Sequence, residues 1–134
     1  MLTANDILTS SGKYPDRAKS PEVTKELLNN IELLLSKVNP FLAELGLTSV
    51  KVSSGFRTSA VNAATKGAAA KSNHMLGLAV DIEDLHGDLD ALVGMNDVLL
   101  KKYGLWQEDS ASTPSWLHLD IKDRGKRPKN VFKP

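Results

Sequence analysis

The stretch KSNHMLGLAVDIED, residues 71–84, places a carboxylate, Asp81, inside a short apolar run. Residues 78–83 have the length and apolar content of a short buried strand. Successive side chains of a strand point to opposite faces, so Val80 and Ile82 share one face and Asp81 projects from the other. The stretch therefore predicts a strand that turns aliphatic side chains toward the core and an acid toward the second face of a sheet.

A second stretch, WLHLDI at residues 116–121, alternates in the same way. Its aliphatic side chains share one face, while Trp116, His118 and Asp120 share the other. Any antiparallel sheet with one solvated face shows this alternation, so the pattern alone is compatible with ordinary surface residues. Both strands nevertheless carry a potential metal ligand or proton carrier on the face away from the core.

Two imidazoles and one carboxylate, from His74, Asp81 and His118, make a common ligand set for a catalytic zinc, which keeps a fourth position for water. His74 precedes its strand by a few residues, so a loop can fold it back over Asp81. His118 can come from a neighbouring strand. The same donors also suit other divalent ions. The sequence therefore predicts a divalent metal site on the second face of the sheet.

The rest of the chain predicts helices followed by short strands. A first helix is expected to start at the N-cap Ser20 with Pro21 at its first position, to break at Asn39–Pro40, and to resume as far as Gly46. Further helices are expected at 58–66 and 88–103, and further strands at 48–53 and 105–108. This order indicates an α+β fold, with a small antiparallel sheet flanked by helices.

The chain of 134 residues, 41% of them hydrophobic, has the size of one ordinary domain. We expect a single domain over residues 1–134. Within it, residues 1–19 are polar and turn-rich and predict an irregular N-terminal arm, from which Leu2, Ile7 and Leu8 can dock on the core.

Composition excludes several classes of function. The chain has no cysteine, which removes disulfides and thiolate chemistry. No signal peptide is visible, and no apolar run approaches the ~20 residues that a membrane span needs, so we expect no membrane partner. The net charge of +1 and the aromatic content of 5% argue against nucleic acid as a partner. The basic residues after position 121 are expected to form a solvated tail or to meet an anionic polymer.

Three linked motifs resemble the M15 family of zinc D,D-carboxypeptidases and peptidoglycan endopeptidases, in particular its small phage and prophage members. The family shows an S-G-[YF]-R stretch, then S-x-H-x-x-G-x-A-x-D, then W-x-H near the C-terminus. This chain has SGFR at 54–57, SNHMLGLAVD at 72–81 and WLH at 116–118, in the same order. The resemblance covers roughly residues 20–134.

The resemblance implies Zn2+ held by His74, Asp81 and His118, and hydrolysis of an amide bond in a peptidoglycan stem peptide. It also implies the fold shared by the hedgehog signalling domain and the D,D-peptidases, with the zinc in a groove on the sheet.

The same resemblance suggests roles for residues around the metal. Arg57 would bind the substrate carboxylate or the developing oxyanion, a task that suits the guanidinium fork. Ser72 is expected either to bind substrate or to cap its loop. Trp116 is expected either to form a substrate-binding wall of the groove or to pack on the sheet.

The chain departs from the family at the general base, the group that takes a proton from water and passes it to the leaving amine. In many relatives this acid lies three residues before the second histidine, where this chain has Ser115. The acids nearby are Glu108, Asp109 and Asp120. We select Glu108, because a hairpin between its strand and the next would bring it near His118. Asp120 can instead orient the His118 ring.

These observations predict a zinc peptidase acting on peptidoglycan, either a D,D-carboxypeptidase or an L-alanyl-D-glutamate or cross-bridge endopeptidase. We expect a monomer, encoded by a phage or prophage and made in the cytoplasm. It would act on the cell wall after release during phage lysis, or as a virion component. The alternative is a non-catalytic module of the same fold that binds wall or protein, which the missing acid at position 115 keeps open.

Overall fold

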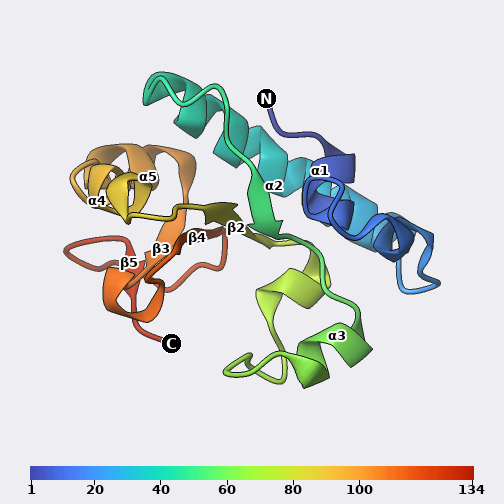
Figure 1. Ribbon diagram of the computed structural model, residues 1–134. Helices are drawn as coiled ribbons and strands as arrows, with labels where there is room; N and C mark the ends of the chain where they lie inside the picture. Colours follow the sequence, from blue (N-terminus) through green and yellow to red (C-terminus); the bar gives the residue numbers. More distant parts are fainter.

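The computed structural model describes residues 1–134 and shows one sheet with helices packed around it (Figure 1). The α-helices are α1 (Ala4–Thr9), α2 (Lys25–Glu44), α3 (Ser59–Ala64), α4 (Asp88–Gly94) and α5 (Asp97–Tyr103). The short 3-10 helices are η1 (Pro15–Lys19), η2 (Asn73–Leu76) and η3 (Ser110–Ser112). The strands are β1 (Val52–Ser54), β2 (Ala79–Glu83), β3 (Trp106–Glu108), β4 (Trp116–Asp120) and β5 (Val131–Phe132). The fold is therefore α+β, as the sequence predicts.

The five strands form one mixed sheet in the order β1-β2-β4-β3-β5. Neighbouring strands are antiparallel, except that β3 and β5 run parallel. The expectation of a purely antiparallel sheet is therefore wrong. The cause is the segment 121–130, which leaves the end of β4 and returns the chain on the far side of β3, where β5 enters in the direction of β3.

The core lies between the sheet and the long helix α2, which crosses behind the strands in Figure 1. The inward-facing side chains of the two central strands are fully buried with those of the helix: Ile31, Leu34, Val38, Val80, Ile82, Leu117 and Leu119. The alternation of aliphatic residues read from the sequence is thus confirmed for β2 and β4. It leaves Asp81, His118 and Asp120 on the opposite face.

Helix α2 starts later and runs further than predicted. Its N-cap is Thr24, whose side-chain oxygen accepts a hydrogen bond from the N–H of Leu27 at 3.2 Å, whereas Ser20 accepts one from Glu22 in the preceding turn. The expected break at Pro40 is absent, because the helix continues to Glu44. Proline removes the hydrogen bond to the carbonyl four residues earlier and crowds that carbonyl. Here that carbonyl belongs to Ser36, a residue exposed to water, and the packing of the buried Val38, Phe41 and Leu42 on the core favours the continuous helix.

The helix predicted over 88–103 is divided into α4 and α5. Asn96 leaves the helical conformation, and its side-chain Nδ2 donates to the carbonyl oxygen of Leu92 at 2.7 Å. Asparagine commonly competes with the backbone in this way, so the chain turns at Met95–Asn96 before the second helix begins. The strand predicted at 48–53 is also shorter and later, since β1 covers only Val52–Ser54.

The N-terminal arm is more ordered than predicted, because a capping box begins the helix α1 within it. Leu2, Ile7 and Leu8 are buried in the core, as expected. Gly55 permits the close approach of α1, since a Cβ at that position would lie 2.1 Å from the carbonyl oxygen of Ile7. The same carbonyl accepts a hydrogen bond from the N–H of Phe56 at 2.8 Å. The arm is therefore tied directly to the SGFR segment.

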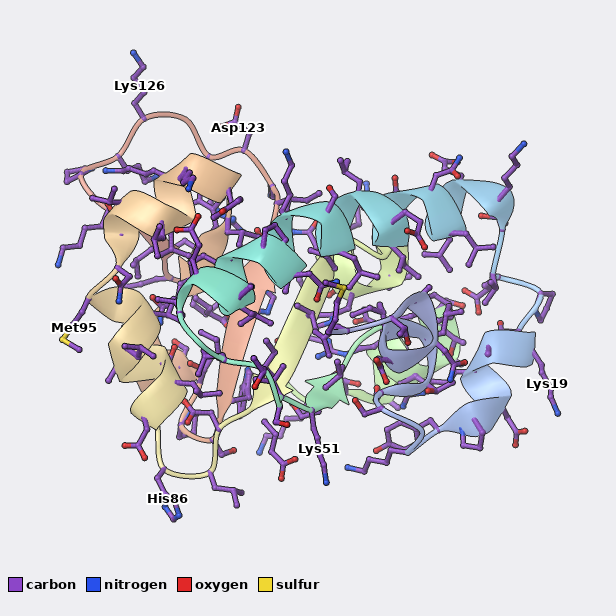
Figure 2. All side chains as sticks on the ribbon, turned by 90° about the horizontal axis from the view of Figure 1, so that it is seen from above. Lys19, Lys51, His86, Met95, Asp123 and Lys126 are labelled. Atoms are coloured by element: carbon purple, nitrogen blue, oxygen red, sulfur yellow. The ribbon has the colours of Figure 1, made fainter.

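Two loops stand away from the sheet in Figure 2. One joins β2 to α4 and carries His86, which points outward and is exposed. The other joins β4 to β5 and carries Asp123 and Lys126 at the upper edge of that view. No helix of the structure has the length and apolar character needed to cross a membrane.

Candidate metal centre

Three side chains of the ligand type converge on the sheet face away from the core. His74 comes from η2, Asp81 from β2 and His118 from β4, where it lies directly opposite Asp81 in the antiparallel register. One potential ligand atom from each residue lies within 4.8 Å of the other two, and all three residues are buried. The structure thus brings together the three residues that the sequence selects as metal ligands.

One hydrogen bond of the backbone and one of the ring fix the position of His74. Ser72 Oγ accepts a hydrogen bond from the backbone N–H of His74 at 3.2 Å and caps η2. Nδ1 of the ring lies 2.8 Å from the carbonyl oxygen of Gly55, an acceptor that requires Nδ1 to carry the proton. Nε2 then faces Asp81 Oδ2 at 3.3 Å and is the ring atom available to a metal.

The ring of His118 lies between two carboxylates. Its Nδ1 is 2.7 Å from Asp81 Oδ1, and its Nε2 is 2.8 Å from Asp120 Oδ2. Burial disfavours a charged imidazole, but the hydrogen bonds with Asp120 and Asp81 outweigh that effect and raise the pKa of His118 to about 10. In the metal-free protein the ring is therefore an imidazolium at neutral pH and donates to both acids.

Asp81 is the central anion of the cluster. Burial alone would raise the pKa of its carboxyl, yet the neighbouring His74 and His118 hold that pKa below its ordinary value. Arg57 adds a further cation, with Nη2 lying 3.5 Å from Asp81 Oδ2. Asp81 is therefore ionised at neutral pH, as a metal ligand must be.

This donor set fits a zinc ion. Both imidazoles turn one nitrogen toward Asp81 and use the other in a hydrogen bond, to the Gly55 carbonyl for His74 and to Asp120 for His118. Histidines that bind metals almost always have such an outer partner, which fixes the tautomer and the direction of the ring. Two neutral imidazoles and one carboxylate leave a fourth tetrahedral position for water or substrate. The chemistry of these residues thus matches a catalytic rather than a closed structural site.

Arg57 lies at the edge of the cluster with a side chain 13% exposed. Its Nε donates to Ser54 Oγ at 3.2 Å, and its Nη1 donates to Asn62 Oδ1 at 3.5 Å. Asn62 in turn donates from Nδ2 to the carbonyl oxygen of Ala69 at 2.8 Å. Asn62 lies outside the three sequence motifs, and it links Arg57 to the loop after α3.

Glu108 lies at the end of β3 near the metal ligands. Gln107 pairs with Leu119 across the antiparallel register, so the next residue along β3 lies beside His118. Burial raises the pKa of the Glu108 carboxyl, the positive charge of His118 lowers it, and Asp81 raises it again, with a net increase. These mutual effects mean that the carboxyl lies within electrostatic range of the metal ligands.

The other acids near the site are already engaged. Asp109 Oδ1 accepts a hydrogen bond from the N–H of Ala111 and caps η3. Asp120 accepts from His118 and is almost completely buried, so it makes the contact expected of a residue that orients that ring. Ser115 is exposed at the turn before β4. The Glu108 side chain makes no hydrogen bond or ion pair in the structure, and its role as the general base stays a prediction.

Ser72 and Trp116, the residues expected to meet substrate, lie at the N-cap of η2 and at the start of β4. Ser72 caps η2 through its hydroxyl, which is the loop-capping role that the sequence left open. Trp116 is half-buried at the start of β4, opposite Glu83 and on the same face as His118. Substrate binding by either residue stays a prediction. His86, the remaining histidine, lies outside the site on its exposed loop (Figure 2).

Two residues of the site come from the segment that the sequence presents as a basic tail. Arg124 donates from both terminal nitrogens to Asp120. The ring of Phe132 meets that of His118 edge-on, with 5.7 Å between centroids. No spacing rule links either residue to the metal ligands, because their position depends on how the loop 121–130 folds back.

The sequence also matches a known family beyond the motifs themselves. A family model described as Peptidase M15 matches residues 2–120, which include all three candidate ligands, Arg57 and Glu108. No curated protein and no solved structure matches the chain. Because the match spans most of the chain and the ligand set of a zinc-dependent peptidase is assembled in the structure, the chain belongs to the peptidase M15 family.

Proposed function

We propose that this protein is a zinc peptidase that hydrolyses an amide bond in the stem peptides of peptidoglycan. The observation that carries the proposal is the convergence of His74, Asp81 and His118, whose potential ligand atoms lie within 4.8 Å of one another. We also propose that the domain has the arrangement of the hedgehog and D,D-peptidase fold, with the metal in a groove on the sheet. The mixed five-stranded sheet with its helices is compatible with that arrangement.

Zinc, when bound, would supply Lewis acidity and lower the pKa of water to about 7. The protein supplies the proton transfers. Glu108 accepts a proton from the attacking water and delivers it to the nitrogen of the leaving amine. The raised pKa of its half-buried carboxyl suits both steps, because a group that titrates closer to neutral pH can both take and return a proton.

Arg57 would bind an anionic oxygen of the substrate, either a carboxylate or the oxygen that gains charge as the carbonyl is attacked. Its hydrogen bonds with Ser54 and Asn62 hold the guanidinium in place before substrate arrives, which reduces the cost of ordering it. A free terminal carboxylate would make the enzyme a D,D-carboxypeptidase. An internal bond would make it an L-alanyl-D-glutamate or cross-bridge endopeptidase.

The direct test is digestion of purified peptidoglycan. We expect new free amino groups to appear, to stop appearing when a chelator removes the metal, and to return when zinc is added. Mass spectrometry of the fragments then identifies the bond that is cut. Binding to the wall without release of amino groups, and without dependence on metal, would instead support the non-catalytic module, the alternative that the serine at position 115 keeps open.

The general base is tested by Glu108→Gln. This change removes the proton acceptor but keeps the shape of the side chain, so we expect turnover to fall by about 100-fold or more while zinc content stays at the wild-type level. Asp109→Asn is the matched control, because asparagine caps a helix about as well as aspartate and should leave activity nearly unchanged. Full activity of the Glu108 variant, or loss of activity in the Asp109 variant, would show that a residue other than Glu108 is the general base.

Phage or prophage origin, action on the wall after release from the cytoplasm or as part of a virion, and a monomeric state remain predictions from the sequence resemblance. Peptidoglycan is the expected partner throughout. Assays of the purified protein on walls of several bacteria would define the host range.

A further inference from the structure

The segment that follows β4 folds back onto the metal centre. The family match ends at residue 120, and the remaining chain carries a charged loop and the strand β5. Two of its residues contact the site: Arg124 donates to Asp120, the partner of His118, and Phe132 packs edge-on against the His118 ring. The part of the chain beyond the family match therefore contributes contacts to the site.

Arg124 makes two of the four hydrogen bonds that the buried Asp120 carboxylate accepts, and the others come from His118 and Lys122. The Asp120 side chain is 1% exposed, and burying a carboxylate is costly unless it is paired and hydrogen-bonded. Arg124 Nη1 donates to Oδ1 at 2.7 Å and Nη2 donates to Oδ2 at 3.0 Å, a two-pronged contact that fixes the plane of the carboxylate. The N–H of Lys122 adds a third bond to Oδ1 at 3.1 Å. With the carboxylate in this plane, Oδ2 lies 2.8 Å from Nε2 of His118.

The guanidinium of Arg124 is itself held by an aromatic ring. Its Cζ lies 3.5 Å from the centroid of the Phe132 ring, a stacking contact that arginine favours. Phe132 lies on β5 opposite Glu108 of β3, and the carbonyl oxygen of Phe132 accepts a hydrogen bond from Asp109 N–H at 2.7 Å. Pairing of β5 with β3 therefore fixes the Phe132 ring, on which the guanidinium of Arg124 stacks.

We propose that Arg124 is a positioning residue of the metal centre, which acts through Asp120 to fix the direction of the His118 imidazole. The proposal rests on the proposed function in one respect, that His118 binds the metal. Without Arg124, the buried Asp120 carboxylate loses two of its four hydrogen bonds and can turn toward the remaining donors. The His118 ring then loses the fixed acceptor that holds Nδ1 in the direction of Asp81.

The test measures zinc affinity in Arg124→Ala by competition with a chromophoric chelator. Removal of an outer partner of a ligand typically lowers metal affinity about 10- to 100-fold, and we expect a loss in that range. Arg127→Ala is the matched control. It removes the same charge from the same loop, but Arg127 stacks on Trp106 and does not contact Asp120. Its zinc affinity should stay within about twofold of wild type.

Two further variants decide whether the effect passes through Asp120. Asp120→Asn should lower by a similar factor the zinc affinity that remains after correction for the proton displaced from His118, and the double variant with Arg124→Ala should be no weaker than Asp120→Asn alone, because residues that act through one contact are not additive. Additive losses, or wild-type affinity in Arg124→Ala, would overturn the proposal.

Arg124→Lys guards against a variant that fails to fold. It keeps the charge but loses the fork, so we expect an intermediate affinity, with melting temperature and circular dichroism recorded in chelator as the check on folding. Wild-type affinity in a folded Arg124→Lys would overturn the need for the two-pronged contact. Zinc affinity is measured without substrate, so the two proposals fail separately. A wild-type protein that binds zinc but releases no amino groups from peptidoglycan would contradict the proposed function and would not affect the role proposed for Arg124.

Discussion

At the scale of single residues, the site is a short chain of alternating charges. Arg124, Asp120, His118 and Asp81 follow one another, each within hydrogen-bond distance of the next. Each opposite charge favours the ionised form of its neighbour, so the pKa of Asp120 is lowered by His118 and Arg124 even though burial acts against it. A metal that binds His118 must displace the proton on Nδ1, and this sets how binding depends on pH.

The first prediction concerns that proton. Because the pKa of His118 is raised to about 10, the imidazole is protonated at pH 7, and zinc binding should release about one proton from it. Raising the pH removes the competing proton, so affinity should increase about tenfold per pH unit between about pH 7 and 9 and level off above the pKa. Calorimetry in buffers of different ionisation enthalpy measures the release directly.

Two variants control this experiment. Asp120→Asn removes one of the two acids that hold the proton, so fewer protons should be released at pH 7. His86→Ala changes a histidine on the exposed loop of Figure 2 and should behave as wild type. Release of no protons by the wild-type protein at pH 7 would show that the imidazole is neutral before the metal arrives.

At the scale of elements, the sequence predicts some features well and others poorly, for physical reasons. The strands β2 and β4 follow from local alternation, and so do the faces that carry Asp81 and His118. The continuous helix α2 does not, because whether Pro40 breaks the helix depends on the packing of the residues around it, such as the buried Val38 and Phe41. Arg124 could not be assigned to the site, because its contact depends on the return of a loop rather than on a repeat.

A buried network connects the element that carries Glu108 to α4. Asp90 of α4 accepts hydrogen bonds from Gln107 Nε2 at 2.5 Å and from Thr113 Oγ1 at 2.9 Å. Gln107 precedes Glu108 on β3, and Thr113 lies in the loop that leads to β4. Asp84 holds the start of the same helix through the N–H groups of residues 89 and 90. The network therefore fixes both ends of the β3–β4 connection.

The prediction at this scale is that Thr113→Val destabilises the protein by about 1–3 kcal/mol, because a buried carboxylate oxygen of Asp90 loses its donor. Peptidase activity should fall further than zinc affinity, since the loop supports Glu108 and not the ligands. Denaturant unfolding and chelator competition measure the two quantities. Thr48→Val, at an exposed position, should change stability by less than about 0.5 kcal/mol. Equal changes in stability in Thr113→Val and Thr48→Val would show that the buried network does not stabilise the protein.

At the scale of the whole molecule, segments from the full length of the chain meet around the metal centre. The N-terminal helix α1 bonds to the SGFR segment through Ile7 and Phe56, the ligands come from residues 74–118, and β5 closes the sheet beside β3. A metal bound there would link η2, β2 and β4, so it would oppose unfolding of the domain as a unit. Metal binding and folding stability are thus expected to be coupled.

The last prediction measures that coupling. Zinc at a thousandfold excess over its dissociation constant should add about 4 kcal/mol to the free energy of unfolding, which corresponds to a rise in melting temperature of roughly 15 °C for a domain of this size. The shift should grow with the logarithm of the zinc concentration. His118→Ala should lose most of it, and His86→Ala should retain it. A shift of the same size in both variants would mean that the stabilising zinc binds elsewhere, because His118 is one of the three converging ligands and His86 is not.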